Sequence, residues 1–307
     1  MSVTHPTFLS RGSAGRRQRA GMAFAVPAAL VFLLVLAYPV FESFRTSLYN
    51  IDLLTGEASF TGLGNYADII RDESLRRTIR NTLLWTVGSL AGQLLLGLGA
   101  ALLIDADWRG MRWIRQLLLI PYVVPVIATA LVWQWMLDGQ YGVLGHTLQS
   151  VGVVPEGSTP LGLEGSSLWT VIIVNIWRGF PFAMLVYWAR MQSIDREQYE
   201  AARVDGAGAW HEFRHITLPN LRSATIALLA LRGIWTLMYF ELVWLLSRGG
   251  PAGSSEVLST HIYKLVMGEF RIGYAAAIAT AAGLLTAAIG TVGWLAVRTA
   301  SRRHSRA

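Results

Sequence analysis

Four stretches of this chain each run for at least 20 residues without Asp, Glu, Lys or Arg, and no other sequence feature restricts the fold as strongly. About 20 apolar residues in a helix cross the hydrocarbon core of a bilayer, where every backbone polar group must be paired within the protein. Two further stretches have the length but contain charge, at Arg178 in one and at Arg232 and Glu241 in the other. The sequence therefore predicts an all-α polytopic membrane protein with six transmembrane helices. The six stretches are residues 22–41, 81–104, 116–137, 165–189, 223–247 and 272–297.

Composition agrees with this class and excludes several others. Of the 307 residues, 53% are hydrophobic and 15% are charged, whereas about 25% of a soluble domain is charged. The chain has no cysteine, which excludes disulfides, thiolate metal sites and cysteine nucleophiles. The net charge of +7 comes from arginines that flank the apolar runs. Because membrane proteins set their orientation in this way, we expect no nucleic-acid partner.

The basic residues also predict the orientation of the spans. The first run follows a basic segment, but it is longer than the 7–15 residues of a signal-peptide core and has no small-residue cleavage site after it, so we expect a retained anchor helix. Of the 26 Lys and Arg residues, 16 lie in the termini and the two even-numbered connections, and 8 lie on the opposite side. Both termini are therefore predicted to be cytoplasmic in a multi-pass protein of the plasma or inner membrane. The predicted parts are a cytoplasmic tail at 1–21, a six-helix domain at 22–298 and a basic cytoplasmic tail at 299–307.

Two segments stand out on the predicted outer side. Arg71, Arg76, Arg77 and Arg80 depart from the charge rule, and we expect them in a surface helix that leads into the second span. Residues 138–170 contain no Lys or Arg and are rich in Gly, Ser and Pro. This composition is typical either of an ordered docking loop or of a solvated connector.

The long cytoplasmic connection, residues 193–221, predicts a helix-turn-helix that stands off the membrane. Asp195 followed by Gln198 indicates a helix N-terminus with a reciprocal cap. Gly206 is expected to end this helix. A second short helix then passes through Trp210 and Phe213, and the Leu218-Pro219 pair is expected to begin the fifth span.

This connection resembles the EAA loop of ABC importer permeases. The match is carried by Glu200-Ala201-Ala202, Gly206, Ile216 and Leu218-Pro219, at every spaced position of the family pattern. Further matches point to the MalF-like branch, which serves carbohydrate uptake. They are residues 60–66 and 81–83 before and in span two, 120–122 with Pro125 in span three, Trp177 with Pro181 and Phe182 in span four, 249–251 after span five, and 273–277 in span six.

The resemblance implies a type I ABC importer (MetI-like) permease fold and a set of partners. These are a second, MalG-like permease, two ATP-binding subunits, an extracytoplasmic solute-binding protein and the membrane lipid. The chain has no GxxxxGK[ST] phosphate loop. We therefore expect no enzyme activity and no cofactor in this chain, with ATP and Mg²⁺ bound by the partner ATPase. The residues expected to couple the permease to that ATPase are Glu200, Ala201, Ala202, Asp205, Gly206, Trp210, Phe213, Leu218 and Pro219.

Polar and aromatic residues in spans four and five predict a solute cavity. Charged groups within a span are costly and usually face a cavity or a partner. Each set below has the spacing i, i+3, i+4, i+7, which places it on one helical face. The candidates are Asn175, Arg178, Gly179 and Phe182 in span four, and Arg232, Trp235, Thr236 and Tyr239 in span five. These positions also align with those that line the cavity of the maltose importer.

Three questions about this site stay open at the sequence level. The two arginines replace smaller or uncharged groups of the maltose importer, which leaves room for an acidic or phosphorylated solute, as in a glycerol-phosphate-type importer. The same side chains are also compatible with packing and with contacts to the second permease. Glu241 lies roughly opposite Arg232 on a straight helix and is a further cavity or partner-facing candidate.

Two functions of other classes compete with this interpretation. His211-Glu212-Phe213-Arg214-His215 is an HExxH sequence, the pattern in which two histidines bind zinc and a glutamate activates water. A membrane zinc protease also needs a third protein ligand, and the other histidines are expected in tails or outer loops, so we expect no metal. An ion-coupled carrier usually shows internal repeats, and we find no such repeat here.

Overall fold

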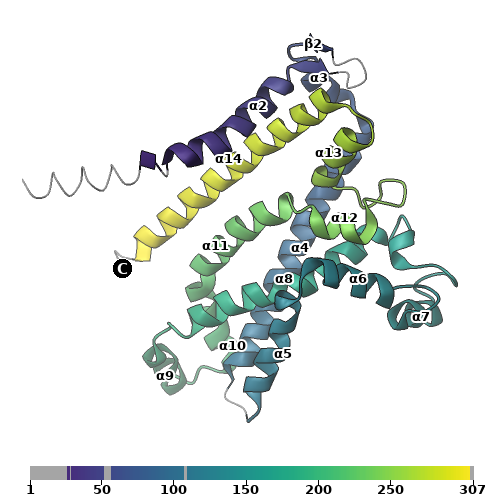
Figure 1. Cartoon of the computed structure of the whole chain (residues 1–307). Coiled ribbons are helices and arrows are strands. Elements are labelled where there is room, and N and C mark those ends of the chain that lie inside the picture. Colours follow the sequence, from purple (N-terminus) through teal and green to yellow (C-terminus); the bar gives the residue numbers. More distant parts are fainter. Residues whose placement is uncertain (1–25, 28, 52–56, 107–108, 305–307) are drawn as a thin grey trace, which may run out of the picture.

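The computed structural model describes residues 26–27, 29–51, 57–106 and 109–304, and within these ranges it is almost entirely helical. The predicted all-α class is therefore confirmed, with one short hairpin, β1 (Tyr49–Ile51) and β2 (Ala58–Phe60), on the loop after the first helix (Figure 1). The α-helices are α2 (Tyr38–Thr46), α3 (Gly64–Arg71), α4 (Glu73–Asp105), α5 (Met111–Val123), α6 (Val126–Met136), α7 (Val143–Ser150), α8 (Ser167–Met191), α9 (Arg196–Val204), α10 (Ala209–Glu212), α11 (Leu218–Leu237), α12 (Glu241–Ser247), α13 (Leu258–Met267) and α14 (Ile272–His304). Short π or 3₁₀ turns are η1 (Leu33–Ala37), η2 (Pro160–Gly162) and η3 (Phe213–Thr217).

Six spans are present if each of two bent helix pairs counts as one span. Within the described residues, four helical segments are long and apolar enough to cross a bilayer: Ala29–Ser47, Glu73–Asp105, Ser167–Met191 and Ile272–Gly293. The third and fifth spans are bent, by 98° between α5 and α6 and by 49° between α11 and α12. The expectation of one uninterrupted run at 116–137 and at 223–247 was wrong in this respect.

The two bends have different physical causes. Pro125 disfavours a helical conformation of the residue before it, and Val124 is extended at φ −64° and ψ 130°. The second bend follows Leu237, where the Trp85 indole of α4 donates to the Thr236 carbonyl at 2.8 Å. A broken helix is tolerated at membrane depth where other protein groups take up the freed backbone atoms.

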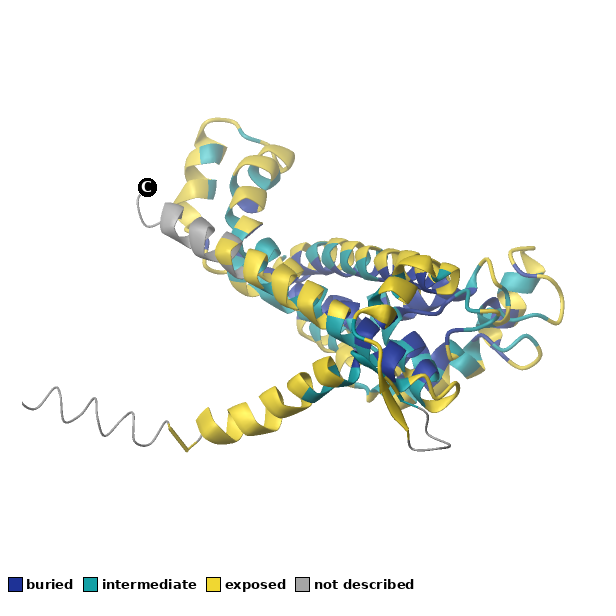
Figure 2. Ribbon diagram, turned by 90° about the horizontal axis from the view of Figure 1, so that it is seen from above, coloured by how far each residue is buried: buried dark blue, intermediate teal, exposed yellow. Residues whose placement is uncertain are grey.

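The packing of α4 against α8 forms the centre of the molecule. Glycines let the two backbones approach, as is usual between helices in membranes. At Gly97 a Cβ atom would lie 2.7 Å from Ala183 Cβ and 3.0 Å from both the Met184 nitrogen and the Phe180 carbonyl oxygen. Buried side chains from both helices form one core with α5 and α11, and Figure 2 shows the buried residues gathered along these elements.

The N-terminal helix projects away from this core. Its C-terminal part, α2, contacts α14, and most of the helix is exposed in this chain (Figure 2). Its large apolar side chains, such as Leu34 (68% exposed) and Val40 (70% exposed), therefore need lipid or a partner subunit as their surroundings. The predicted tail at 1–21 lies outside the described residues. The helix α14 continues into the predicted C-terminal tail up to His304.

The segment before the second span differs from its predicted form. Arg71 ends the separate surface helix α3, as expected, but Arg76, Arg77 and Arg80 already belong to the first turns of α4. Asp72 caps α4 by accepting from the Leu75 N–H at 3.1 Å. The helix of the second span therefore begins at Glu73, directly after the surface helix α3 and before the predicted start of the span at residue 81.

A loop between α12 and α13 is bound to the ends of two spans. Asn81 of α4 donates to the Gly253 and Ser254 carbonyls at 3.2 and 3.1 Å, and Ser167 of α8 donates to the Gly250 carbonyl at 2.7 Å. The matched Gly-Gly-Pro sequence, residues 249–251, therefore lies in a loop whose backbone carbonyls bind the ends of α4 and α8.

A buried carboxylate lies at the end of this loop. Glu256 Oε1 contacts His261 Nδ1 at 2.5 Å, and Glu256 Oε2 accepts from Lys264, the only lysine of the chain. Burial opposes ionisation of Glu256, but the hydrogen bonds from His261 and Lys264 outweigh it and keep the pKa of Glu256 below its ordinary value.

Acidification is expected to destabilise the protein through this carboxylate. Because the folded-state pKa of Glu256 is lowered, its contribution to stability is complete above the ordinary glutamate pKa of about 4.3 and is lost as the pH falls through the lowered value. The melting temperature in detergent, followed by tryptophan fluorescence between pH 6 and pH 3, should therefore fall less in Glu256→Gln than in the unmodified protein. Glu269→Gln is the control, because Glu269 is exposed and 3.8 Å from its partner Arg271. Parallel curves for Glu256→Gln and the unmodified protein would contradict the prediction.

Candidate functional site

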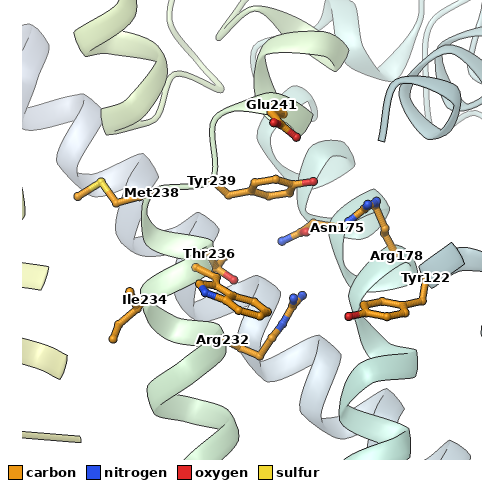
Figure 3. Close-up of a pocket in the computed structure, with 10 residues that line it drawn as sticks. Tyr122, Asn175, Arg178, Arg232, Ile234, Thr236, Met238, Tyr239 and Glu241 are labelled. Atoms are coloured by element: carbon orange, nitrogen blue, oxygen red, sulfur yellow. The ribbon is translucent and has the colours of Figure 1, made fainter. Parts of the chain in front are cut away.

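A cavity of about 720 Å³ lies where α5, α8, α11 and the start of α12 face one another (Figure 3). It includes seven of the nine residues predicted to line a cavity, together with three that were not predicted. We call it the central cavity. Its lining consists of Tyr122, Asn175, Arg178, Arg232, Ile234, Trp235, Thr236, Met238, Tyr239 and Glu241.

Arg232 is anchored by a side chain of the second span. Its Nε and Nη2 atoms donate to Gln93 Oε1 at 3.0 and 2.7 Å. Gln93 Nε2 in turn donates to the backbone carbonyl of Asn175 at 3.1 Å. Gln93 is 1% exposed. These bonds join α4, α8 and α11 behind the cavity wall.

Gly179 makes room for this network. A Cβ atom at Gly179 would lie 2.4 Å from Arg232 Nη2 and 2.4 Å from Gln93 Cδ. The predicted cavity residue Gly179 is therefore not among the lining residues but lies directly behind them. Its lack of a side chain allows Arg232 and Gln93 to meet.

Aromatic rings surround the Arg232 guanidinium. Phe182 lies between Tyr122 and Trp235, with ring centroids 5.9 and 6.2 Å apart. The Arg232 guanidinium carbon is 5.8 Å from the Phe182 centroid and 6.0 Å from the Trp235 centroid, within the range of a cation–π contact. Phe182, like Gly179, supports the wall and is not one of the lining residues.

The bend of the fifth span changes the position of Glu241. On a straight helix Glu241 would lie opposite Arg232, but the helix ends before Met238 and restarts at Glu241. Both side chains therefore line the same cavity, and the expectation of opposite faces was wrong because it assumed an uninterrupted helix.

Tyr122 in the cavity lining and Gln93 behind it are the main site residues that sequence reasoning missed. A signal for Gln93 existed, because it is the only amide between Thr82 and Ile104 in an otherwise apolar span, and polar side chains in spans commonly join helices. Tyr122 comes from the third span, where the face directed at the cavity depends on the bend at Val124. Ile234 and Met238 carry no polar signal at all.

Loss of Gln93 is expected to cost stability, because it leaves a buried guanidinium without its acceptor. Gln93→Leu should lower the free energy of unfolding by about 2 kcal/mol. The double variant Gln93→Leu with Arg232→Met removes both partners and should recover most of that loss. Thermal unfolding in detergent measures the stability of the single and the double variant. If Gln93→Leu alone is as stable as the unmodified protein, the network contributes nothing to stability.

The EAA loop forms the second functional region, at the end of the molecule where α4 meets α5 (Figure 1). Asp195 caps α9 by accepting from the Glu197 N–H at 3.2 Å, as predicted. The predicted reciprocal cap by Gln198 is replaced, since Gln198 Oε1 accepts from Asn220 Nδ2 at 3.4 Å. Glu200, Ala201, Asp205, Leu218 and Pro219 are exposed, while Ala202 and Phe213 are half-buried.

Gly206 ends α9 in a left-handed conformation with φ +81°. Its N–H donates to the Arg203 carbonyl at 3.1 Å, and the Ala207 N–H donates to the Ala202 carbonyl at 2.9 Å. These two bonds define a Schellman cap, in which glycine is favoured because it has no Cβ to clash. The interruption predicted at Gly206 is confirmed.

The second helix of the loop is continuous with the fifth span. The helix α11 begins at Leu218 with Pro219 in its first turn, as predicted, but it continues without a break from α10, so that one helical segment runs from Ala209 to Leu237. Pro219 lacks an N–H and would clash with the carbonyl four residues earlier, and the wider π turn η3 (Phe213–Thr217) precedes it. One continuous helical segment therefore links the EAA loop to the cavity residues Arg232, Trp235 and Thr236.

The surroundings of the HExxH sequence in this loop do not resemble those of a zinc site. Glu212 accepts from Arg203 Nε and Nη2 at 2.7 and 3.2 Å, and this hydrogen bond keeps the pKa of Glu212 below its ordinary value. A general base needs a pKa closer to neutral. No third metal-binding side chain joins His211 and His215 among the residues that the structure describes. The carboxylate instead joins α9 to α10.

Exposed apolar side chains mark the tip of the loop. Val204 is 87% exposed and Trp210 is 71% exposed, and the Trp210 and Phe213 rings are 5.6 Å apart. An exposed tryptophan beside a half-buried phenylalanine is typical of a residue cluster that anchors a protein partner.

Bent spans around a polar cavity, together with a helical loop that projects from one end, define a helical membrane permease. The chain belongs to the family of binding-protein-dependent transport system inner membrane components, whose model matches residues 93–305. It is the sugar-type ABC importer permease indicated by the EAA loop, and it has the MetI-like fold.

Similar proteins fall in the same class. The chain is 31% identical to the trehalose/maltose transport system permease protein MalF of Thermococcus litoralis, over 86% of this chain and 90% of that protein. It is 32% identical to the sulfoquinovosyl glycerol transport system permease protein SmoG of Agrobacterium fabrum, over 89% of this chain and 88% of that protein. A bacterial alginate ABC transporter, solved in complex with an alginate pentasaccharide-bound periplasmic protein, matches with a TM-score of 0.75 and 26% identity over 94% of this chain and 96% of that chain.

Proposed function

We propose that this chain is the transmembrane permease subunit of an ABC importer that moves a carbohydrate or related polyol into the cell. The observation that carries the proposal is the central cavity, in which amide, guanidinium and hydroxyl groups surround a space bordered by aromatic rings. Such a surface suits a ligand with polar edges and flat apolar faces. The names of the relatives, which handle trehalose, maltose, sulfoquinovosyl glycerol and alginate, support the carbohydrate class.

The proposed complex contains a second, MalG-like permease, two ATP-binding subunits and an extracytoplasmic solute-binding protein. The alginate transporter supports the last of these, because it was solved with a periplasmic protein. ATP and Mg²⁺ would bind to the ATP-binding subunits. In this complex Val204, Trp210 and Phe213 of the EAA loop contact an ATP-binding subunit, and the exposed N-terminal helix contacts lipid or the second permease.

The proposed coupling is mechanical. Arg203 and Glu212 hold α9 against α10, and the Tyr199 and Thr217 hydroxyls, 2.9 Å apart, hold it to the end of η3. Movement of an ATP-binding subunit would therefore displace the loop as one body. The continuous segment from Ala209 to Leu237 would carry that displacement to Trp235 and Thr236 in the cavity wall.

Both termini and the EAA loop are proposed to face the cytoplasm. Because the chain has no cysteine, single cysteines test this directly without a background. In intact cells, a membrane-impermeant maleimide should label Ser158→Cys in the outer loop and leave Ala207→Cys in the EAA loop unlabelled. Reversed labelling would place the EAA loop outside and exclude contact with a cytoplasmic ATPase.

The function itself is tested by uptake. The complete transporter, reconstituted with its binding protein in proteoliposomes, should accumulate a radiolabelled saccharide only with ATP on the side of the ATP-binding subunits. ATP-independent accumulation driven by an ion gradient would instead support a carrier.

A further inference from the structure

The central cavity carries more positive than negative charge. Arg178 and Arg232 are its cationic lining residues, and Glu241 is its anionic one. None of the ion pairs among the described residues joins any two of these three side chains. Charged groups at membrane depth are normally paired or directed at a functional ligand.

The two arginines differ in the hydrogen-bond acceptors that the protein offers to their guanidinium groups. Arg232 has a neutral acceptor in Gln93 and two aromatic neighbours, so its position is fixed by this chain while its charge remains. Arg178 makes no hydrogen bond or ion pair within the described part of the chain, and its Nε atom is buried without an acceptor. The guanidinium of Arg178 therefore keeps its donors free.

A second unpaired donor lies one turn away on the same face of α8. Asn175 is 2% exposed, and its Nδ2 atom is buried without an acceptor. Figure 3 shows Asn175 and Arg178 on α8 at the cavity, which Tyr239 and Glu241 also line. Buried donors without acceptors are costly, so this pair indicates a site for an acceptor-rich ligand group.

We propose that the imported solute is a saccharide with an acidic group, a carboxylate, sulfonate or phosphate, and that Arg178 and Asn175 bind this group. The proposal rests on the proposed function and narrows its solute class. A planar guanidinium offers two parallel donors to such an anion, and Arg232 adds positive charge from the facing helix. Trp235 and Tyr239 face the sugar ring, while Glu241 accepts from its hydroxyl groups and repels the acidic end toward the arginines.

The test compares three pairs of radiolabelled probes in the reconstituted transporter. The members of each pair have the same number of sugar rings, and only one of them is acidic: galacturonate and galactose, trigalacturonate and maltotriose, and glucose 6-phosphate and glucose. At least one acidic probe should be taken up about tenfold faster than its neutral partner. Arg178→Gln should reduce that ratio about tenfold, and Arg178→Lys, which keeps the charge, should restore part of it. Arg248→Gln is the matched control, because Arg248 is exposed at the end of α12, outside the cavity.

The outcomes separate the solute class from the function. If no acidic probe is taken up faster than its neutral partner, or if Arg178→Gln leaves the ratio unchanged, the acidic-saccharide proposal is overturned while carbohydrate import stands. Uptake of none of the six probes by an assembled, ATP-hydrolysing complex contradicts both. If Arg178→Gln prevents co-purification of the second permease and Arg178→Lys restores it, the arginine pairs with that subunit, and the proposal fails.

Discussion

Gly97→Leu is expected to prevent α4 from packing against α8 and to cause a large loss of stability. Even a Cβ atom at Gly97 would lie 2.7 Å from Ala183 Cβ and 3.0 Å from two backbone atoms of α8. Backbone atoms cannot rotate away, so the helices must separate along the main core. We expect a loss of about 3 kcal/mol in the free energy of unfolding, seen as a lower melting temperature in detergent.

Gly99→Leu provides the matched control on the same helix. No atom lies within 4 Å of a Cβ built at Gly99, and Leu is a better helix former than Gly. This variant should therefore be as stable as the unmodified protein or slightly more so. Equal melting temperatures for the two leucine variants would show that close contact of α4 with α8 does not hold the fold together.

Gly206→Val is expected to abolish most ATP-driven uptake while the protein remains in the membrane. The left-handed φ of +81° costs a β-branched residue about 1–3 kcal/mol, so the cap of α9 would be lost in most molecules. The exposed tip of the loop would then no longer be presented as one surface. The measurement is uptake per ATP hydrolysed in proteoliposomes.

Two further variants isolate the backbone conformation as the cause. Gly208 has an extended backbone, φ −82° and ψ 168°, and open space around it, so Gly208→Val should retain uptake. Gly206→Asn should lose less than Gly206→Val, because Asn tolerates the left-handed region. If all three variants transport equally well, the shape of the loop at Gly206 does not matter for coupling.

The parts of the fold that depend on local sequence were predictable. The apolar runs of α4, α8 and α14 identify spans because lipid permits only helices with paired backbones, and Gly206 indicates a helix end by its lack of a Cβ. The bend between α11 and α12 was not predictable in the same way. It coincides with a tertiary contact of Trp85, more than 150 residues earlier in the chain, whose indole donates a hydrogen bond to the Thr236 carbonyl.

The cavity, too, was predictable where it depends on local sequence and not where it depends on tertiary packing. The spacing of Arg232, Trp235 and Thr236 places them on one helical face, and the structure brings them together. Tyr122 joins the lining from another span, and Gln93 holds Arg232 from behind it. Only tertiary packing brings these two side chains to the site. The position of Glu241 depends on the bend, so an argument from helical spacing placed it on the wrong side.

Affinity purification of the tagged chain in mild detergent, with the co-purifying chains, their stoichiometry, ATP hydrolysis and zinc content measured on one sample, tests the central claim most directly. The proposed function predicts a complex with a second permease and two copies of an ATP-binding subunit that hydrolyses ATP. A chain that purifies alone and carries one zinc ion would contradict that account and make His211, Glu212 and His215 the centre of the function.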